Sequence, residues 1–185
     1  GVDWLLSTPI IAFVVCLFFS IGFINAVNTV DGANGLVIGI FVISCYIFSS
    51  EMHGIALSAG LYGASLFLTF NVVSGRLFLG DAGAYGIGSV MLLTGLTAYS
   101  EGVVSLAFLA VLFFYPCFDF LVSIIRRRRN GQSITAPDND HLHNRVHAYF
   151  KSIFKSKNIA NSVTGLSIAA GSSGIALAGY VGELI

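Results

Sequence analysis

Residues 8–24 read TPIIAFVVCLFFSIGFI and contain no charged side chain. A helix needs roughly 20 apolar residues to cross the ~30 Å hydrocarbon core of a bilayer, so this stretch and its flank are long enough for one crossing. Five further apolar stretches follow, at residues 36–50, 54–70, 84–99, 103–125 and 159–181. We therefore expect an all-α fold, a polytopic membrane helix bundle with about six transmembrane helices.

The composition supports a membrane protein and argues against several other classes. Apolar residues make up 56% of the 185 residues and charged residues only 10%, whereas a soluble domain carries about 25% charged residues. The 21 glycines suit close helix packing in lipid. The formal net charge of zero in so apolar a chain gives nucleic-acid binding no support. The three cysteines lie in apolar stretches without metal-ligand spacing.

The basic residues all fall on one side of the expected bundle. With six spans, the segments 25–35, 71–83 and 126–158 share a side, and they contain all nine Lys and Arg residues. Because positively charged loops stay inside, we expect a multi-pass protein of the inner (plasma) membrane with its active site on the cytoplasmic face. We treat residues 1–185 as one integral membrane domain, in which residues 126–158 form a long cytoplasmic loop.

The first cytoplasmic segment, residues 25–36, reads NAVNTVDGANGL. Helical spacing would place Asn25, Asn28 and Asp31 on one face, and Asn34 follows between two glycines. These amides and the carboxylate predict a polar ligand site. A simple polar turn is the alternative, since Asp-Gly and Asn-Gly are common turn dipeptides.

The second segment, residues 76–86, reads RLFLGDAGAYG and places Asp81 between two glycines. A carboxylate on a glycine turn can bind Mg²⁺, which takes one or two carboxylates together with substrate phosphates. As the structural alternative, Asp81 would be the N-cap of the following helix.

The third segment contains His141, His143 and Arg145 within five residues. Two imidazoles and a guanidinium favour a site for phosphate oxygens; zinc binding, with His147 as a third ligand, is the competing interpretation. The four arginines at 126–129 predict an anchor at the membrane boundary. Residues 147–157 alternate aromatic and basic side chains, which predicts a short interfacial helix. Asp119 lies in the fifth apolar stretch, where a charge is costly, so we expect it to be paired or to face a polar cavity.

Together the three segments resemble the polyprenyl-phosphate N-acetylhexosamine-1-phosphate transferases, which begin the assembly of bacterial peptidoglycan, teichoic acid and O-antigen. The third motif looks more like the O-antigen branch than the peptidoglycan branch. The chain departs from the family pattern at Asn34, Ala84 and Asn144, where many members carry Asp, Ser and a third His. It also contains no Asp-Asp pair, which family members carry on an earlier loop. The resemblance covers essentially all of this chain but only the C-terminal half of family members, so we expect a fragment.

The resemblance implies a reaction and a role for each candidate residue. A polyprenyl phosphate would attack the β-phosphate of a UDP-amino sugar and release UMP, with Mg²⁺ or Mn²⁺ as cofactor. Asp81 would be the metal ligand and Asp31 a second catalytic carboxylate. The remaining candidates would bind substrate, with amides at the nucleotide and basic side chains at the phosphates: Asn25, Asn28, Asn34, His141, His143 and Arg145. A homodimer is compatible with this interpretation.

Two other functions stay open at this stage. An anion-binding transporter or channel would require acidic or broken spans and internal repeats, and the sequence offers only Asp119 within a span and no clear repeat. A catalytically inactive scaffold of the same family would keep the three motifs but lack the Asp-Asp loop.

Overall fold

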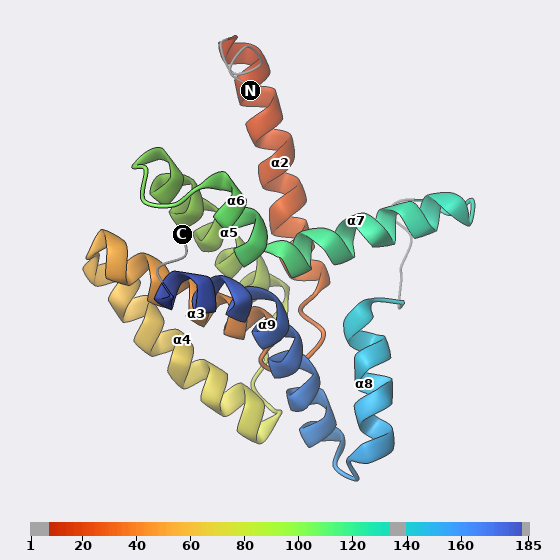
Figure 1. The fold of residues 1–185 in the computed structure, drawn as a ribbon. Helices are drawn as coiled ribbons and strands as arrows, with labels where there is room; N and C mark the ends of the chain where they lie inside the picture. The colour runs from red at the N-terminus through yellow and green to blue at the C-terminus, as the bar shows by residue number, and fades with distance from the viewer. Residues whose placement is uncertain (1–7, 134–139, 183–185) are drawn as a thin grey trace.

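The computed structural model describes residues 8–133 and 140–182, and all regular structure in these ranges is helical (Figure 1). This confirms the all-α prediction. The helices are α2 (Pro9–Thr29), α3 (Leu36–Met52), α4 (Ile55–Ser74), α5 (Gly80–Ser100), α6 (Leu106–Leu112), α7 (Phe114–Arg129), α8 (Leu142–Ile153) and α9 (Lys157–Val181).

Among these, α2, α4 and α9 are each long and apolar enough to cross a membrane, and α6 with α7 forms a fourth candidate span that is sharply bent. Helix α3 is apolar but shorter. The membrane-bundle prediction is therefore confirmed, with three or four clear spans where the sequence suggested about six. The outer surfaces fit lipid: on α2, Ile10 is 76% exposed and Phe18 is 81% exposed. Figure 1 shows the N-terminal part of α2 extending away from the other helices.

The expected straight span over residues 103–125 is interrupted, which corrects the sequence interpretation. Helices α6 and α7 meet at Phe113 with a bend of 74°. Pro116 explains the break, because proline has no N–H and its ring clashes with the carbonyl four residues earlier. That carbonyl belongs to Leu112, and it accepts a hydrogen bond from the Ser173 hydroxyl of α9 at 2.6 Å instead.

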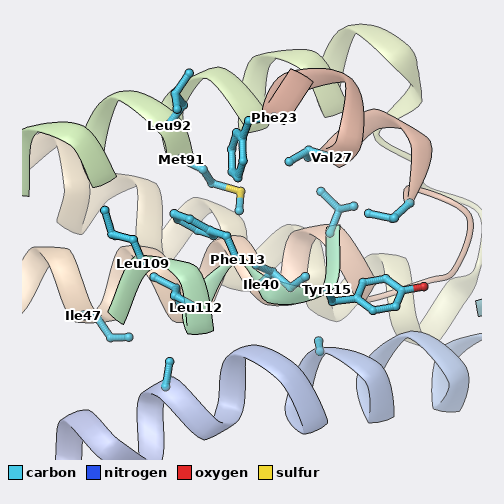
Figure 2. Close-up of a cluster of buried hydrophobic side chains, with 14 of the residues drawn as sticks. Phe23, Val27, Ile40, Ile47, Met91, Leu92, Leu109, Leu112, Phe113 and Tyr115 are labelled. Atoms are coloured by element: carbon cyan, nitrogen blue, oxygen red, sulfur yellow. The ribbon is translucent and has the colours of Figure 1, made fainter. Parts of the chain in front are cut away.

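Helix α3 lies inside the bundle and packs against α4, α5 and α9, while α2 packs against α5 and α7. Small residues permit these approaches: a β-carbon on Gly88 of α5 would lie 3.2 Å from Val27 of α2. The buried apolar side chains form one cluster (Figure 2), in which the rings of Phe23 and Phe113 meet edge to face at 5.1 Å. This cluster packs α2 against α5, which places the C-terminal end of α2 and the N-terminal end of α5, with their adjoining turns, next to each other.

The predicted interfacial helix is shifted in the structure. Helix α8 ends at Ile153, and Lys157 already belongs to α9. The chain leaves the helix because Phe154 is extended and the Ser156 side chain caps α9 by accepting the N–H of Ile159. Helix α8 therefore begins earlier than expected and includes His143 and Arg145.

Candidate functional site

A polar cavity of about 260 Å³ lies where the turn after α2 meets the start of α5. It joins the first two sequence motifs, although they are far apart in the chain. Its lining residues are Asn28, Asp31, Gly32, Ala33, Asn34, Asn71, Phe78, Leu79, Gly80, Asp81 and Asn161. Small-molecule pockets usually measure ~300–1,000 Å³, so this cavity suits a phosphate group with a cation better than a whole nucleotide sugar.

One buried amide that the sequence analysis missed holds both loops of the cavity. The Oδ1 atom of Asn71 accepts the backbone N–H of Gly35 at 2.6 Å, and its Nδ2 atom donates to the carbonyl of Leu77 at 2.6 Å. Gly35 has φ +83°, a left-handed conformation that favours glycine. Asn71 is 5% exposed. An amide at the end of an apolar stretch was the signal that could have identified it.

Asn34 fastens the same turn to α9. Its Nδ2 atom donates to Asn158 Oδ1 at 3.0 Å and lies 3.3 Å from Ser162 Oγ. Gly165 of α9 lies so close to the carbonyl of Asn34 that a β-carbon would overlap it. Asn34 therefore lines the cavity, but the Nδ2 atom of its side chain is committed to the fold.

The two candidate carboxylates, Asp31 and Asp81, line the same cavity. Burial, and next the negative charge of Asp81, raise the pKa of Asp31 to about 6. Asp81 is exposed in the first turn of α5, whose N-cap is Leu79. The N-cap alternative for Asp81 therefore does not hold.

This donor set fits Mg²⁺. A cation would relieve the repulsion between the two carboxylates, and Mg²⁺ commonly binds one or two carboxylates plus phosphate oxygens and water. Within residues 8–133 and 140–182, no group of three or more His, Cys, Asp or Glu side chains is placed to hold a metal by itself. A bound Mg²⁺ would thus need further oxygen ligands, such as those of phosphate and water.

The third motif contacts one wall of the cavity through His143, which packs against Gly32 but does not itself line the cavity. The Nε2 atom of its ring lies so close to Gly32 that a β-carbon there would overlap it, so the ring contacts the turn that carries Asp31. The pKa of His143 falls to about 4, mainly because the ring is buried, so the side chain is neutral at pH 7. His141 is also buried and pairs with Asp119 at 2.6 Å. This pairing confirms the expectation that Asp119 has a partner.

Four predicted site residues are not among those that line the cavity: Asn25, His141, His143 and Arg145. The guanidinium of Arg145 makes two hydrogen bonds of 2.6 Å to Asp140, and its side chain is 68% exposed. His143 lies two residues before Arg145 on α8. Its side chain points in roughly the opposite direction to that of Arg145, because each helical residue turns by about 100°. The Asn25 amide donates to the carbonyl of Ile21 on its own helix.

Comparison with known proteins agrees with the motifs. The profile described as glycosyl transferase family 4 matches residues 2–99, more than half of the chain, including Asp31 and Asp81. The chain belongs to glycosyl transferase family 4. This confirms the resemblance inferred from the three motifs.

Named members of glycosyl transferase family 4 align with most of the chain. A probable undecaprenyl-phosphate N-acetylglucosaminyl 1-phosphate transferase of Bacillus subtilis (strain 168) is 33% identical over 151 residues, which cover 75% of this chain and 41% of the relative. A decaprenyl-phosphate N-acetylglucosaminephosphotransferase of Mycobacterium tuberculosis (strain CDC 1551 / Oshkosh) is 31% identical over 174 residues, 79% of this chain and 43% of the relative. A phospho-N-acetylmuramoyl-pentapeptide-transferase of Staphylococcus aureus (strain JH9) is 26% identical over 145 residues, which cover 75% of this chain and 44% of the relative.

The chain thus matches less than half the length of these family members. No solved structure matches it.

Proposed function

We propose that this chain forms part of an enzyme that transfers a sugar 1-phosphate from a UDP-N-acetylhexosamine to a polyprenyl phosphate such as undecaprenyl phosphate. The observation that carries the proposal is that Asp31 and Asp81 line one polar cavity. The names of the related proteins support the same class of reaction, because they are phosphotransferases acting on polyprenyl phosphates.

The proposed chemistry is a displacement at phosphorus. A phosphate oxygen of the lipid attacks the β-phosphorus of the UDP-sugar, the bond from that phosphorus to the bridging oxygen breaks, and UMP leaves with this oxygen. The products are a polyprenyl diphospho-sugar and UMP. Phosphoryl transfer requires alignment and charge stabilisation more than covalent help from the protein. A bound Mg²⁺, with Mn²⁺ as a substitute, would neutralise the crowded phosphate charge.

The residues of the cavity have distinct roles in this proposal. Asp81 is the metal ligand, and Asp31 is the second carboxylate, which orients the attacking phosphate or shares the cation. Asn28 offers its amide to the substrate, and Asn34, whose Nδ2 atom is bonded to α9, holds the turn in place. His143, whose ring packs against Gly32, supports the turn that carries Asp31 and is proposed to donate a hydrogen bond from Nε2 to a phosphate oxygen bound at that turn.

The setting we propose is the cytoplasmic face of the bacterial inner membrane, in the first membrane step of O-antigen or cell-wall polysaccharide synthesis. The location of all nine basic residues on this side, in residues 71–83 and 126–158, supports this orientation. Basic side chains close to the leaflet would also attract the lipid phosphate.

One observation favours the second candidate, an anion transporter, because α6 and α7 form a broken helix. Transporters place substrate sites at such breaks. Here, however, the cavity of about 430 Å³ beside the break is lined almost entirely by apolar side chains, including Phe23, Leu109 and Phe113. Such a lining has no polar groups for an anion, so the transferase remains the better-supported proposal.

The direct test uses the full-length protein in membranes, with undecaprenyl phosphate and a panel of radiolabelled UDP-sugars. We expect radiolabel in the lipid fraction, dependent on Mg²⁺, for at least one UDP-N-acetylhexosamine, with release of UMP. Failure of every UDP-sugar to label the lipid would contradict the proposal and favour an inactive scaffold.

A further inference from the structure

Helix α7 carries two buried polar side chains on one face. Tyr115 and Asp119 are four residues apart, a spacing that places side chains on the same side of a helix. Tyr115 is 4% exposed and Asp119 is 6% exposed. Figure 2 shows the ring of Tyr115 at the border of the apolar cluster, with its hydroxyl directed away from it. Both side chains meet the start of α8.

Asp119 uses both of its carboxylate oxygens on α8. Its Oδ2 atom lies 2.6 Å from Nδ1 of His141, and its Oδ1 atom accepts the backbone N–H of Leu142 at 3.0 Å. One side chain therefore sets the rotation of the His141 ring and the position of the first turn of α8.

Tyr115 makes the corresponding pair of contacts with His143. Its hydroxyl oxygen accepts the backbone N–H of His143 at 3.2 Å and lies 3.3 Å from Nδ1 of the same ring. The hydroxyl hydrogen is free to donate to Nδ1, because the oxygen is already the acceptor for the backbone. In the neutral ring this contact places the proton on Nε2, the atom that faces Gly32.

The two imidazole rings are consequently held as a unit. They stack with centroids 5.4 Å apart and planes only 4° from parallel. In each ring, Nδ1 is the atom that contacts α7. The same α7 side chain also accepts a backbone N–H at the N-terminus of α8. His141, the N-cap residue, makes no side-chain cap bond of its own, so α7 accepts first-turn N–H groups that a cap would otherwise satisfy.

We infer that Tyr115 and Asp119 are positioning residues of the transfer reaction, which act by orienting the His141–His143 pair toward the turn that contains Gly32. This inference rests on the proposed function. It assigns to α7, outside the three sequence motifs, the task of fixing which ring nitrogen of His143 faces the turn that contains Gly32.

The test is a double-mutant cycle in the full-length protein in membranes. Tyr115→Phe keeps the ring and removes only the hydroxyl, and His143→Ala removes the group through which it acts. We expect Tyr115→Phe to lower kcat/KM on the order of tenfold, as for other partners that orient functional histidines. In the His143→Ala background, the same change should alter kcat/KM less than twofold. Tyr62→Phe on α4, where the tyrosine is 76% exposed, is the matched control and should behave as wild type.

A second cycle pairs Asp119→Asn with His141→Ala. Asp119→Asn should lower kcat/KM in the wild-type background and change it little in the His141→Ala background. If Asp119→Asn fails to insert, the Tyr115 cycle decides the question alone. Equal effects of Tyr115→Phe with and without His143, or no effect at all, would overturn the inference. Activity of the wild-type protein in the same assay would leave the proposed function intact. An inactive wild-type protein would overturn the proposed function and this inference with it.

Discussion

The imidazole ring of His143 occupies the space beside Gly32 that a β-carbon there would need. This contact joins the third motif to the first across more than a hundred residues of sequence. It also makes Gly32 a sensitive position, although the residue itself is exposed.

Gly32→Ala should therefore reduce turnover strongly, because the new methyl group would push the His143 ring away from the turn that carries Asp31. We expect a loss of tenfold or more in kcat/KM, on the order of the cost of misplacing a functional group. Transferase assays on full-length protein would measure it. Gly63→Ala on α4 is the control: nothing lies within 4 Å of a β-carbon there, and alanine is the better helix former. Equal activity of the two variants would show that the contact has no functional weight.

Asp31→Asn should stabilise the protein at neutral pH when divalent cations are removed by EDTA. Because the pKa of Asp31 is raised to about 6 in the fold and is ~3.9 in an unfolded chain, the folded state holds the extra proton between these values. Stability contributed by this group is thus present at low pH and is lost as pH rises from about 4 to about 6. After allowance for solvent screening, the gain in the variant should be about 1–2 kcal/mol.

Thermal unfolding at pH 4 and pH 7.5 would test this, with the advantage of Asp31→Asn expected only at the higher pH. An equal or larger advantage at pH 4 would contradict the assigned cause. The same variant should lose transferase activity, which would identify the destabilising carboxylate as one retained for function.

The structure separates two residues that the sequence motif groups together. His143→Ala should raise the KM for the UDP-sugar by roughly tenfold to a hundredfold, as expected for loss of a hydrogen bond worth about 1.5–3 kcal/mol to a charged phosphate. Arg145→Ala should change it less than threefold, because the guanidinium is bound to Asp140 at the surface. Asp140→Ala is the matched control for loss of that ion pair. A KM effect of Arg145→Ala as large as that of His143→Ala would show that Arg145 turns to the substrate.

The topology has its own test in cysteine labelling. In a cysteine-free background, Gly131→Cys and Ser100→Cys should react with an impermeant reagent from opposite sides of the membrane, and Gly131→Cys from the cytoplasm. Both positions are exposed, so lack of access would not confuse the result. Reaction of both from one side would contradict the assignment made from the basic residues.

The fold class was predictable because hydropathy reports helices in a bilayer directly. The break between α6 and α7 was harder, since Pro116 is tolerated in many membrane helices, and its effect depends on Ser173, which is distant in sequence. The C-terminal end of α8 was misplaced because basic residues continue past Phe154, whereas the chain turns extended at Phe154 and Ser156 caps α9.

The candidate site was predictable in part. Glycine turns next to Asp31 and Asp81 indicated chemistry, and both carboxylates line the cavity. The amides of Asn71 and Asn161 lie near the edges of apolar stretches and carry no local motif, so their position was the one sequence signal, and tertiary structure was needed to place them at the cavity. His143 is buried and Arg145 is exposed. This difference also depends on tertiary packing, which the local motif does not report.

The central claim is that Asp81 binds the cation that phosphoryl transfer needs, and Asp81→Asn tests it most directly. Asparagine preserves size, and Asp81 is exposed without acting as the N-cap of α5, so stability should change by no more than about 0.3–1 kcal/mol, the value of a charge in the first helical turn. Transferase rate and thermal stability of the full-length protein should be measured together across a Mg²⁺ titration. We expect a normally folded protein with little activity, partly restored at high Mg²⁺ or Mn²⁺. A near-normal rate with unchanged Mg²⁺ dependence would contradict the account and transfer the role of principal ligand to Asp31.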